Sequence, residues 1–435
     1  MEWQIALTVI FGSLVVLMLT GMPIALCFLF INVLGAFLLF GWPGGLDQVV
    51  ISIYTSLATF TIAPIPLFIG MGELMFHSGL GGDVVGTVDQ WLGRLPGRQS
   101  LLAVGAGVLL ATLTGASVAS VSILSSTLVP DMEKRGYHKS MIFGPILSAG
   151  SLAVLIPPSV TAVLLASVGE LSVGEILMAI IGPGVLLAAL YAAYIVIVCT
   201  LHPSLAPSQP VDRVPLRERL GNIARNILPV AMIIFSVIGF MLLGIATPEE
   251  AAASGAIATL IVAAAQRRLS WEVIRKSAFG TLRITGMIFL IMAGAKGFSQ
   301  VLSFTGATQS LSEGIPNLSV HPLVVMGMMQ LVMIILGCFM DTMAIILITM
   351  PTFIPAINAL GLDPIWFGAI AVVNLELGMI TPPFGIVLYA MKAMAPPRYC
   401  MGDIIRSVIP FMGLQILAIA ICIVFPSIPL WLVGR

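Results

Sequence analysis

The sequence predicts an all-α polytopic membrane protein, built as an inverted-topology repeat with two re-entrant hairpins and two broken helices. Three observations predict this fold class: an apolar composition, an uneven distribution of basic residues, and a polar, proline-containing pattern that recurs 225 positions along the chain. Of 435 residues, 59% are hydrophobic and 9% are charged, and the mean hydropathy is +1.11. Because soluble domains carry about 25% charged residues, the composition excludes an ordinary soluble fold.

Apolar runs of about 20 residues, the length that crosses the hydrocarbon core, predict the membrane spans. They cover 4–20, 22–42, 50–77, 140–168, 174–200, 223–244, 250–266, 283–304, 364–391 and 407–433. The N-terminal sequence MEWQ has an acid and no basic region, so we expect the first span to stay in the mature protein. Membrane lipid is the expected surrounding of these spans.

Basic residues indicate which connections face the cytoplasm. All Lys and Arg except Lys296 and Arg435 fall in five patches: 94–98, 134–139, 213–225, 267–283 and 392–406. The connections near 41–49, 169–173, 245–249, 305–319 and 357–363 contain none and are expected outside.

Two further polar-tipped segments, 100–130 and 320–356, do not fit single crossings. The first has basic flanks on both sides and the second has none on either side, so each is expected to enter and leave by one face. They are predicted to be re-entrant hairpins from opposite faces, although two short helices would give the same parity. Both chain termini are then expected on the periplasmic side.

When the sequence is aligned with itself at an offset of 225 positions, the two hairpins and the helices after them superpose. Pro130 meets Pro355, the pair Pro157-Pro158 meets Pro382-Pro383, and Ser117 meets Thr342. An odd number of membrane crossings separates the two copies, so the second copy is inverted in the membrane relative to the first. The predicted parts are scaffold helices at 1–60, a first repeat at 61–200, connecting helices at 201–282 and a second repeat at 283–435.

The repeat also predicts where ligands bind, because inverted repeats carry their sites on discontinuous helices near the midplane. The hairpin tips read TLTGASVASVS (112–122) and GCFMDTMA (337–344), and the breaks read AVLIPPSVT (153–161) and GMITPPFG (378–385). Unwound backbone at membrane depth must be buried or line a wet cavity. Its carbonyls, with Ser, Thr and Asp oxygens, suit a small cation, and free N–H groups at half-helix starts suit an anion.

Of four notable acidic residues, two have competing interpretations and two have one each. Asp341 lies in an uncharged run and is a functional candidate. The alternative is that it caps the helix that begins near Thr342, which is compatible with lining a site. Glu376 is either functional or half of a buried ion pair with Lys296. Glu73 is interpreted as structural. Glu250 is expected to close a capping box at the helix start TPEE (247–250).

The remaining patterns argue against other classes of protein. Five cysteines and four histidines show no metal-ligand or disulfide spacing, and the net charge of zero gives no argument for nucleic acid. Nucleotide-binding loops and catalytic triads are not evident. We therefore expect no enzyme activity and no cofactor.

The block LGCFMDTMAIILITMPTFIPAINALGLDPIWFGAIAVVNLELGMITPPFGIVLYA closely resembles the large membrane subunit of the tripartite ATP-independent periplasmic (TRAP) transporters, DctM-like. GIATPEEAAASGA, PLFIGMGELMFHSGL, LVPDMEKRGYHKS and LIPPSV match further stretches. The resemblance implies an elevator-type, sodium-driven importer of the ion-transporter superfamily in the bacterial inner membrane. It implies a small organic acid as substrate, such as a C4-dicarboxylate, a sialic or other sugar acid, or a 2-oxo acid. It also implies two partners, a small four-helix membrane subunit (DctQ-like) and an extracytoplasmic substrate-binding protein (DctP-like).

The resemblance also carries a set of site residues. One sodium site is expected at Thr114, Gly115, Ser117, Ile156 and Pro157, and a second at Met340, Asp341, Thr342, Gly378 and Thr381. Substrate is expected between the tips, near Ser159 and Asn374, with Pro158 and Pro383 beside them. Many members carry Asp or Asn where this chain has Ser120, which puts coordination at the first tip in question.

Two other functions stay open at this stage. A standalone divalent-anion/sodium symporter or an anion antiporter of related fold shares the polar tips and Pro-Pro breaks. An intramembrane enzyme or scaffold would need a nucleophile and base, and no such pair is evident.

Overall fold

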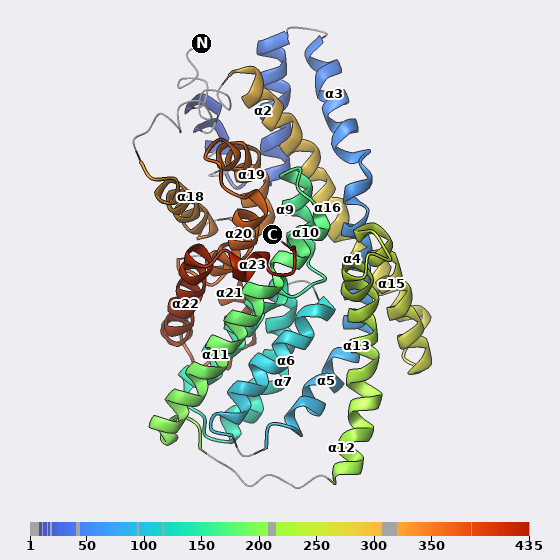
Figure 1. The fold of residues 1–435 in the computed structure, drawn as a ribbon, viewed down its shortest axis with the longest axis vertical. Helices are drawn as coiled ribbons and strands as arrows, with labels where there is room; N and C mark the ends of the chain where they lie inside the picture. Colours follow the sequence, from blue (N-terminus) through green and yellow to red (C-terminus); the bar gives the residue numbers. More distant parts are fainter. Residues whose placement is uncertain are drawn as a thin grey trace.

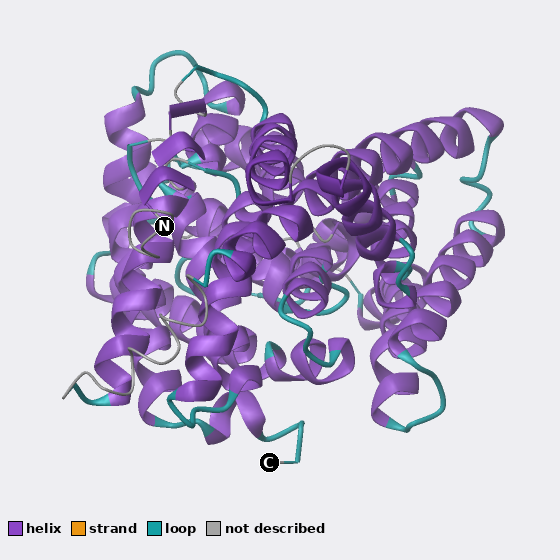
Figure 2. Ribbon diagram, turned by 90° about the horizontal axis from the view of Figure 1, so that it is seen from above, coloured by secondary structure: helices purple, strands orange, loops and turns teal. Residues whose placement is uncertain are grey.

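The protein is described by a computed structural model over residues 8–10, 12–14, 16–17, 20–40, 44–93, 95–114, 117–207, 215–306, 320–338, 340–383 and 385–434. Every regular element in these ranges is a helix (Figures 1 and 2). Six of the described helices are long and apolar enough to cross a membrane, and a bent pair adds a seventh. The chain is therefore a multi-pass membrane protein, as predicted. The first predicted span, 4–20, lies mostly outside the described residues.

One group of helices extends from the top centre of Figure 1 to its right-hand side. It contains α2 (Ile24–Phe40), α3 (Gly44–Leu57), α4 (Pro64–His77), α15 (Pro248–Ala265) and α16 (Trp271–Phe304). Helix α16 packs on α2, α3 and α4, and α15 packs on α4. We call these five helices the scaffold group. The long α16 extends for about 51 Å at 1.5 Å per residue, so the predicted span 283–304 is only its second part.

The predicted span 50–77 is wrong as a single helix. Helix α3 ends at Leu57, a 3-10 turn occupies Phe60–Ile62, and α4 begins at Pro64. Proline lacks an N–H group and its ring clashes with the carbonyl one turn earlier. Pro64 and Pro66 are tolerated in the first turn of α4 but would break a helix that continued from α3.

The first repeat contains a hairpin and a broken helix. The hairpin is α6 (Arg98–Thr114) and α7 (Ser117–Lys134), and the broken helix is α8 (Lys139–Leu155) and α9 (Val160–Val168). Helices α10 (Val173–Ala179) and α11 (Ile181–Leu201) follow, and the short α5 (Leu80–Asp89), which the sequence did not predict, packs on α6.

The second repeat has the same order of elements. The hairpin is α18 (Pro322–Gly337) and α19 (Thr342–Ala359), and the broken helix is α20 (Pro364–Met379) and α21 (Ile386–Met394). Helix α19 begins and ends 225 positions after α7, so the predicted offset is confirmed. In Figure 1, α6 and α7 lie in the lower half and α18 and α19 in the upper half, so the hairpins approach the centre from opposite ends.

The remaining helices connect or close the repeats. They are α12 (Leu216–Asn222), α13 (Leu228–Ile234) and α14 (Phe240–Leu242), joined by π-helical turns, and the C-terminal α22 (Met401–Val424) and α23 (Ser427–Leu430). The predicted span 223–244 is thus interrupted by two π turns. The capping box at Thr247 and Glu250 is confirmed.

The centre of the core is formed by α8 and α20. Residues 141–155 of α8 and 365–378 of α20 are all buried. A helix that is apolar all round lies either in lipid or in a protein core, and the complete burial of these residues places α8 and α20 in the core. Helices α6, α7, α11 and α22 contact α8, whereas α18, α19 and α22 contact α20. The breaks that end α8 and α20 therefore fall inside the molecule.

Candidate functional site

The first break follows α8 and turns the chain by 48°. Ile156 is extended, with φ −115° and ψ 115°, and a cis bond joins Pro157 to Pro158. Ser159 then caps α9, its Oγ accepting a hydrogen bond from the Ala162 N–H at 3.2 Å. Because two prolines remove two N–H donors, the carbonyls at the end of α8 lose their helical partners.

The second break follows α20 and contains the equivalent cis bond, between Pro382 and Pro383. The Thr381 Oγ1 donates to the Leu377 carbonyl at 2.6 Å, and the Thr381 N–H donates to the Gly378 carbonyl at 3.1 Å. Thr381 is half-buried. Each break thus places one hydroxyl side chain beside its proline pair.

The tip of the second hairpin has a capped helix start. Asp341 is the N-cap of α19, and its Oδ1 accepts from the Met343 N–H at 2.8 Å. The N-cap interpretation is confirmed. Next to it, Thr342 is buried and its Oγ1 has no hydrogen-bond partner among the described residues. A buried hydroxyl without a partner is rare in proteins, so this carboxylate and hydroxyl are a reasonable pair of cation ligands.

The second tip lies directly against α20. A Cβ on Gly378 would lie 2.8 Å from the Gly337 Cα, which is closer than real Cβ atoms approach backbone. Both positions therefore require glycine if α18 and α20 are to pack this closely. Met340, next along the tip, is half-buried and donates its N–H to the Leu336 carbonyl at 2.9 Å.

The first tip contacts the second repeat through a buried hydrogen bond. The Ser117 Oγ, at the start of α7, donates to the Glu376 Oε2 of α20 at 2.5 Å. Glu376 is 1% exposed and Ser117 is 5% exposed. The proposed ion pair between Glu376 and Lys296 is wrong, because the Lys296 Nζ pairs instead with the Glu170 Oε1 at 2.6 Å.

The predicted substrate residues are mostly buried. Ser159 and Asn374 are fully buried, Pro158 is buried and Pro383 is exposed. The Asn374 Nδ2 donates at 2.7 Å to both the backbone carbonyl and the Oε1 of Gln330 on α18. In this structure Asn374 therefore joins α20 to the second hairpin, and its contact with substrate stays a prediction.

At the first predicted sodium site, the contacts between described residues do not join all the expected residues. Thr114 is the last residue of α6, and Gly115 lies outside the described residues. Ser117 donates a hydrogen bond to Glu376, and among the described residues no hydrogen bond joins it to Ile156. Ser120 is fully buried on α7.

A buried polar network near α20 was not predicted. The Tyr191 hydroxyl donates to the Gln415 Oε1 at 3.4 Å, and the Gln415 Nε2 donates to the Val373 carbonyl at 2.9 Å. The Ser151 Oγ lies 3.4 Å from the same tyrosine hydroxyl. The network joins α8, α11, α20 and α22, and Gln415 in an apolar span was the signal that could have revealed it.

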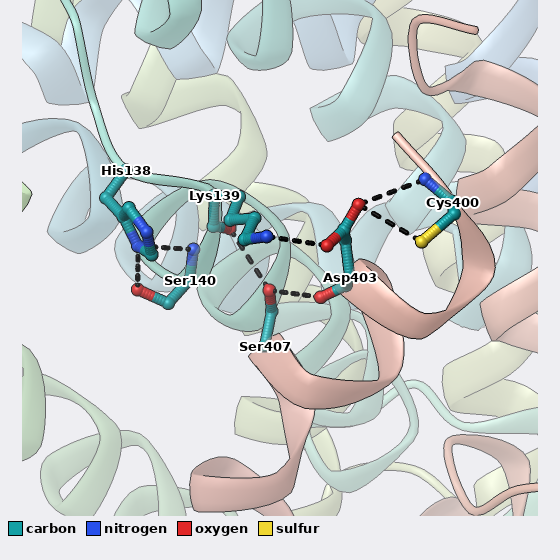
Figure 3. Close-up of polar contacts among 6 residues, drawn as sticks. All are labelled: His138, Lys139, Ser140, Cys400, Asp403 and Ser407. Carbon is teal, nitrogen blue, oxygen red and sulfur yellow. Dashed lines mark hydrogen bonds and ion pairs between the residues drawn. The ribbon is translucent and has the colours of Figure 1, made fainter. Parts of the chain in front are cut away.

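A second polar cluster joins the starts of α8 and α22 at the predicted cytoplasmic end (Figure 3). The Lys139 Nζ donates to the Asp403 Oδ1 at 2.6 Å, and the Cys400 N–H donates to the Asp403 Oδ2 at 3.1 Å. The Ser407 Oγ donates to the carbonyls of Asp403 and Lys139. These contacts hold α22 to the first repeat.

The sequence matches a known family over nearly its whole length. The profile of the family described as "Tripartite ATP-independent periplasmic transporter, DctM component" covers residues 11–428. The chain belongs to this DctM family. It is a large permease subunit of a TRAP transporter, which is a transport protein and not an enzyme.

Relatives within the DctM family carry different substrates in their names. The chain is 32% identical to the C4-dicarboxylate TRAP transporter large permease protein DctM of Pseudomonas aeruginosa, over 89% of this chain and 90% of that protein. It is 28% identical to the ectoine TRAP transporter large permease protein TeaC of Halomonas elongata, over 98% of both. The solved YdaH transporter of Alcanivorax borkumensis has a similar fold, with a TM-score of 0.66 at 16% identity over 90% of this chain and 89% of that one.

Proposed function

We propose that this DctM-family subunit imports a small organic acid across the bacterial inner membrane, driven by a sodium gradient. The expected substrate carries a carboxylate, like the C4-dicarboxylates and ectoine in the names of its relatives. An extracytoplasmic binding protein would deliver it, and a small membrane subunit would brace the scaffold group, as the word tripartite in the family description suggests. Both termini would lie on the periplasmic side.

The observation that carries this proposal is the meeting of polar hairpin tips with broken helices inside the core. Ser117 of the first tip bonds Glu376 of α20, and Gly337 beside the second tip packs on Gly378 of the same helix. Carboxylate, hydroxyl and free carbonyl oxygens are hard ligands that suit a small cation, and half-helix N-termini suit an anionic group. A coupled cation and organic acid would therefore bind within a few residues of each other.

An elevator movement is supported by the relative heights of two sets of helices. The α9–α10 connection and the facing ends of α2 and α3 were both predicted to lie outside. In Figure 1 those ends of α2 and α3 lie at the top, whereas α9 and α10 lie near mid-height. The repeats would then be lowered toward the cytoplasm relative to the scaffold group. Rigid movement of one part past another is a common form of alternating access.

Reconstitution in proteoliposomes tests the proposal. Uptake of a radiolabelled acid that the binding protein recognises should require the binding protein, the small subunit and an inward sodium gradient. Uptake of equal rate without the binding protein would instead favour a standalone symporter or antiporter.

Substitution of Asp341 tests its assignment as a cation ligand. Asp341→Asn keeps an N-cap oxygen but removes the charge, and Asp341→Ala removes both. Both variants should lose sodium-dependent uptake and still assemble. Asp363→Asn is the matched control, because Asp363 caps α20 through the Ile365 N–H at 2.7 Å and lies away from the tips. Normal sodium dependence in Asp341→Asn would refute the assignment.

A further inference from the structure

A large cavity separates the scaffold group from the two repeats. It has a volume of about 790 Å³ and is bounded by α3, the following 3-10 turn, the end of α9, α16 and α19. This is within the roughly 300–1,000 Å³ range of small-molecule sites. The predicted substrate residues Ser159 and Asn374 do not line it. It is therefore a separate compartment from the site at the helix breaks.

The lining of this cavity is suited to a small organic anion. Hydroxyl groups come from both sides, including Thr55 and Thr59 near the end of α3, Ser167 on α9 and Ser299 on α16. Of the described lining residues, Lys296 carries the positive charge and Glu170 the negative charge. Thr55 and Ser167 already donate to the carbonyls of Ser52 and Thr61, so the Lys296 ammonium is the group of this lining that would bind a carboxylate.

Glu170 already occupies the position of a carboxylate at Lys296. The Lys296 Nζ lies 2.6 Å from the Glu170 Oε1, and the side chains are 42% and 74% exposed. A solvated ion pair of this kind is weak, so another carboxylate can replace Glu170 at small cost. Glu170 lies in the α9–α10 connection, whereas Lys296 belongs to the scaffold group. If the repeats move as an elevator, this pair must separate on each cycle and leave Lys296 free.

We propose that this cavity is an outer vestibule in which Lys296 binds the carboxylate of the incoming organic acid, and that Glu170 is the internal carboxylate which the acid displaces. The inference rests on the proposed import of an organic acid and adds a second binding position to it. Substrate would contact Lys296 after release from the binding protein and before it reaches the helix breaks.

Two variants with opposite expected effects test the vestibule. Lys296→Gln removes the cation and should raise the KM for uptake about tenfold, the loss expected for one charge-assisted contact. Glu170→Gln removes the competing carboxylate and should lower the KM. If the pair only holds the α9–α10 connection to α16, both variants should shift uptake in the same direction. That result, or an unchanged KM in Lys296→Gln, would overturn the proposal.

The matched control is Lys276→Gln, on the same helix. Lys276 pairs with Glu272 at 2.7 Å and does not line the cavity, so its KM should not change. Thermal unfolding of each purified variant checks that the fold is intact. If the unsubstituted system shows no sodium-dependent uptake, the proposed function itself fails. If it transports normally and Lys296→Gln does too, the vestibule alone is refuted.

Discussion

The hydrogen bond between Ser117 and Glu376 provides a direct test of how the two repeats are joined. Ser117→Ala removes the donor and leaves the Glu376 Oε2 in a site that is 1% exposed, where water cannot replace the lost partner. Leaving a buried polar group unsatisfied costs about 1–3 kcal/mol. We therefore expect Ser117→Ala to reduce the free energy of unfolding by this amount.

Equilibrium unfolding of the purified chain in mixed detergent micelles measures the effect. Ser126→Ala is the control, because Ser126 lies on the same helix, is exposed and bonds only its own helix through the Ile123 carbonyl at 3.0 Å. In a double-mutant cycle, Ser117→Ala should cost little once Glu376→Met has removed the carboxylate. If Ser117→Ala and Ser126→Ala differ by less than about 0.5 kcal/mol, the bond does not stabilise the junction.

Two further substitutions test local packing and capping, by the same unfolding measurement. Gly378→Ala places a methyl group 2.8 Å from the Gly337 Cα and should destabilise the protein by about 1–3 kcal/mol. A Cβ on Gly327, on the same helix as Gly337, would meet nothing within 4 Å, so Gly327→Ala should be neutral or stabilising. Equal effects of Gly378→Ala and Gly327→Ala would contradict the close packing. Thr247→Ala removes the capping box of α15 and should lower the free energy of unfolding by about 0.5–2 kcal/mol. Thr247→Ser should keep the capping box and the stability. A neutral Thr247→Ala would show that Glu250 alone caps the helix.

Features that depend on a few neighbouring residues were predictable from the sequence. The breaks after α8 and α20 follow from proline pairs, because proline removes an N–H donor wherever it stands. The cap at Asp341 depends on residues only two positions apart. The repeat offset was visible because both copies carry the same local pattern. Interruptions such as the one before Pro64 were missed because a window of about 20 residues averages over a single turn.

Partners far apart in the chain were decided only by the tertiary structure. Glu376 bonds Ser117, 259 positions away, and Lys296 pairs with Glu170, 126 positions away. Composition and periodicity place a charged residue on a helix, but they do not say which neighbour that helix will have. The cavity between the scaffold group and the repeats likewise depends on how two separately predicted parts pack. The sequence by itself therefore determined the family, the repeat and the helix breaks, and the packing of the repeats determined which side chains meet there.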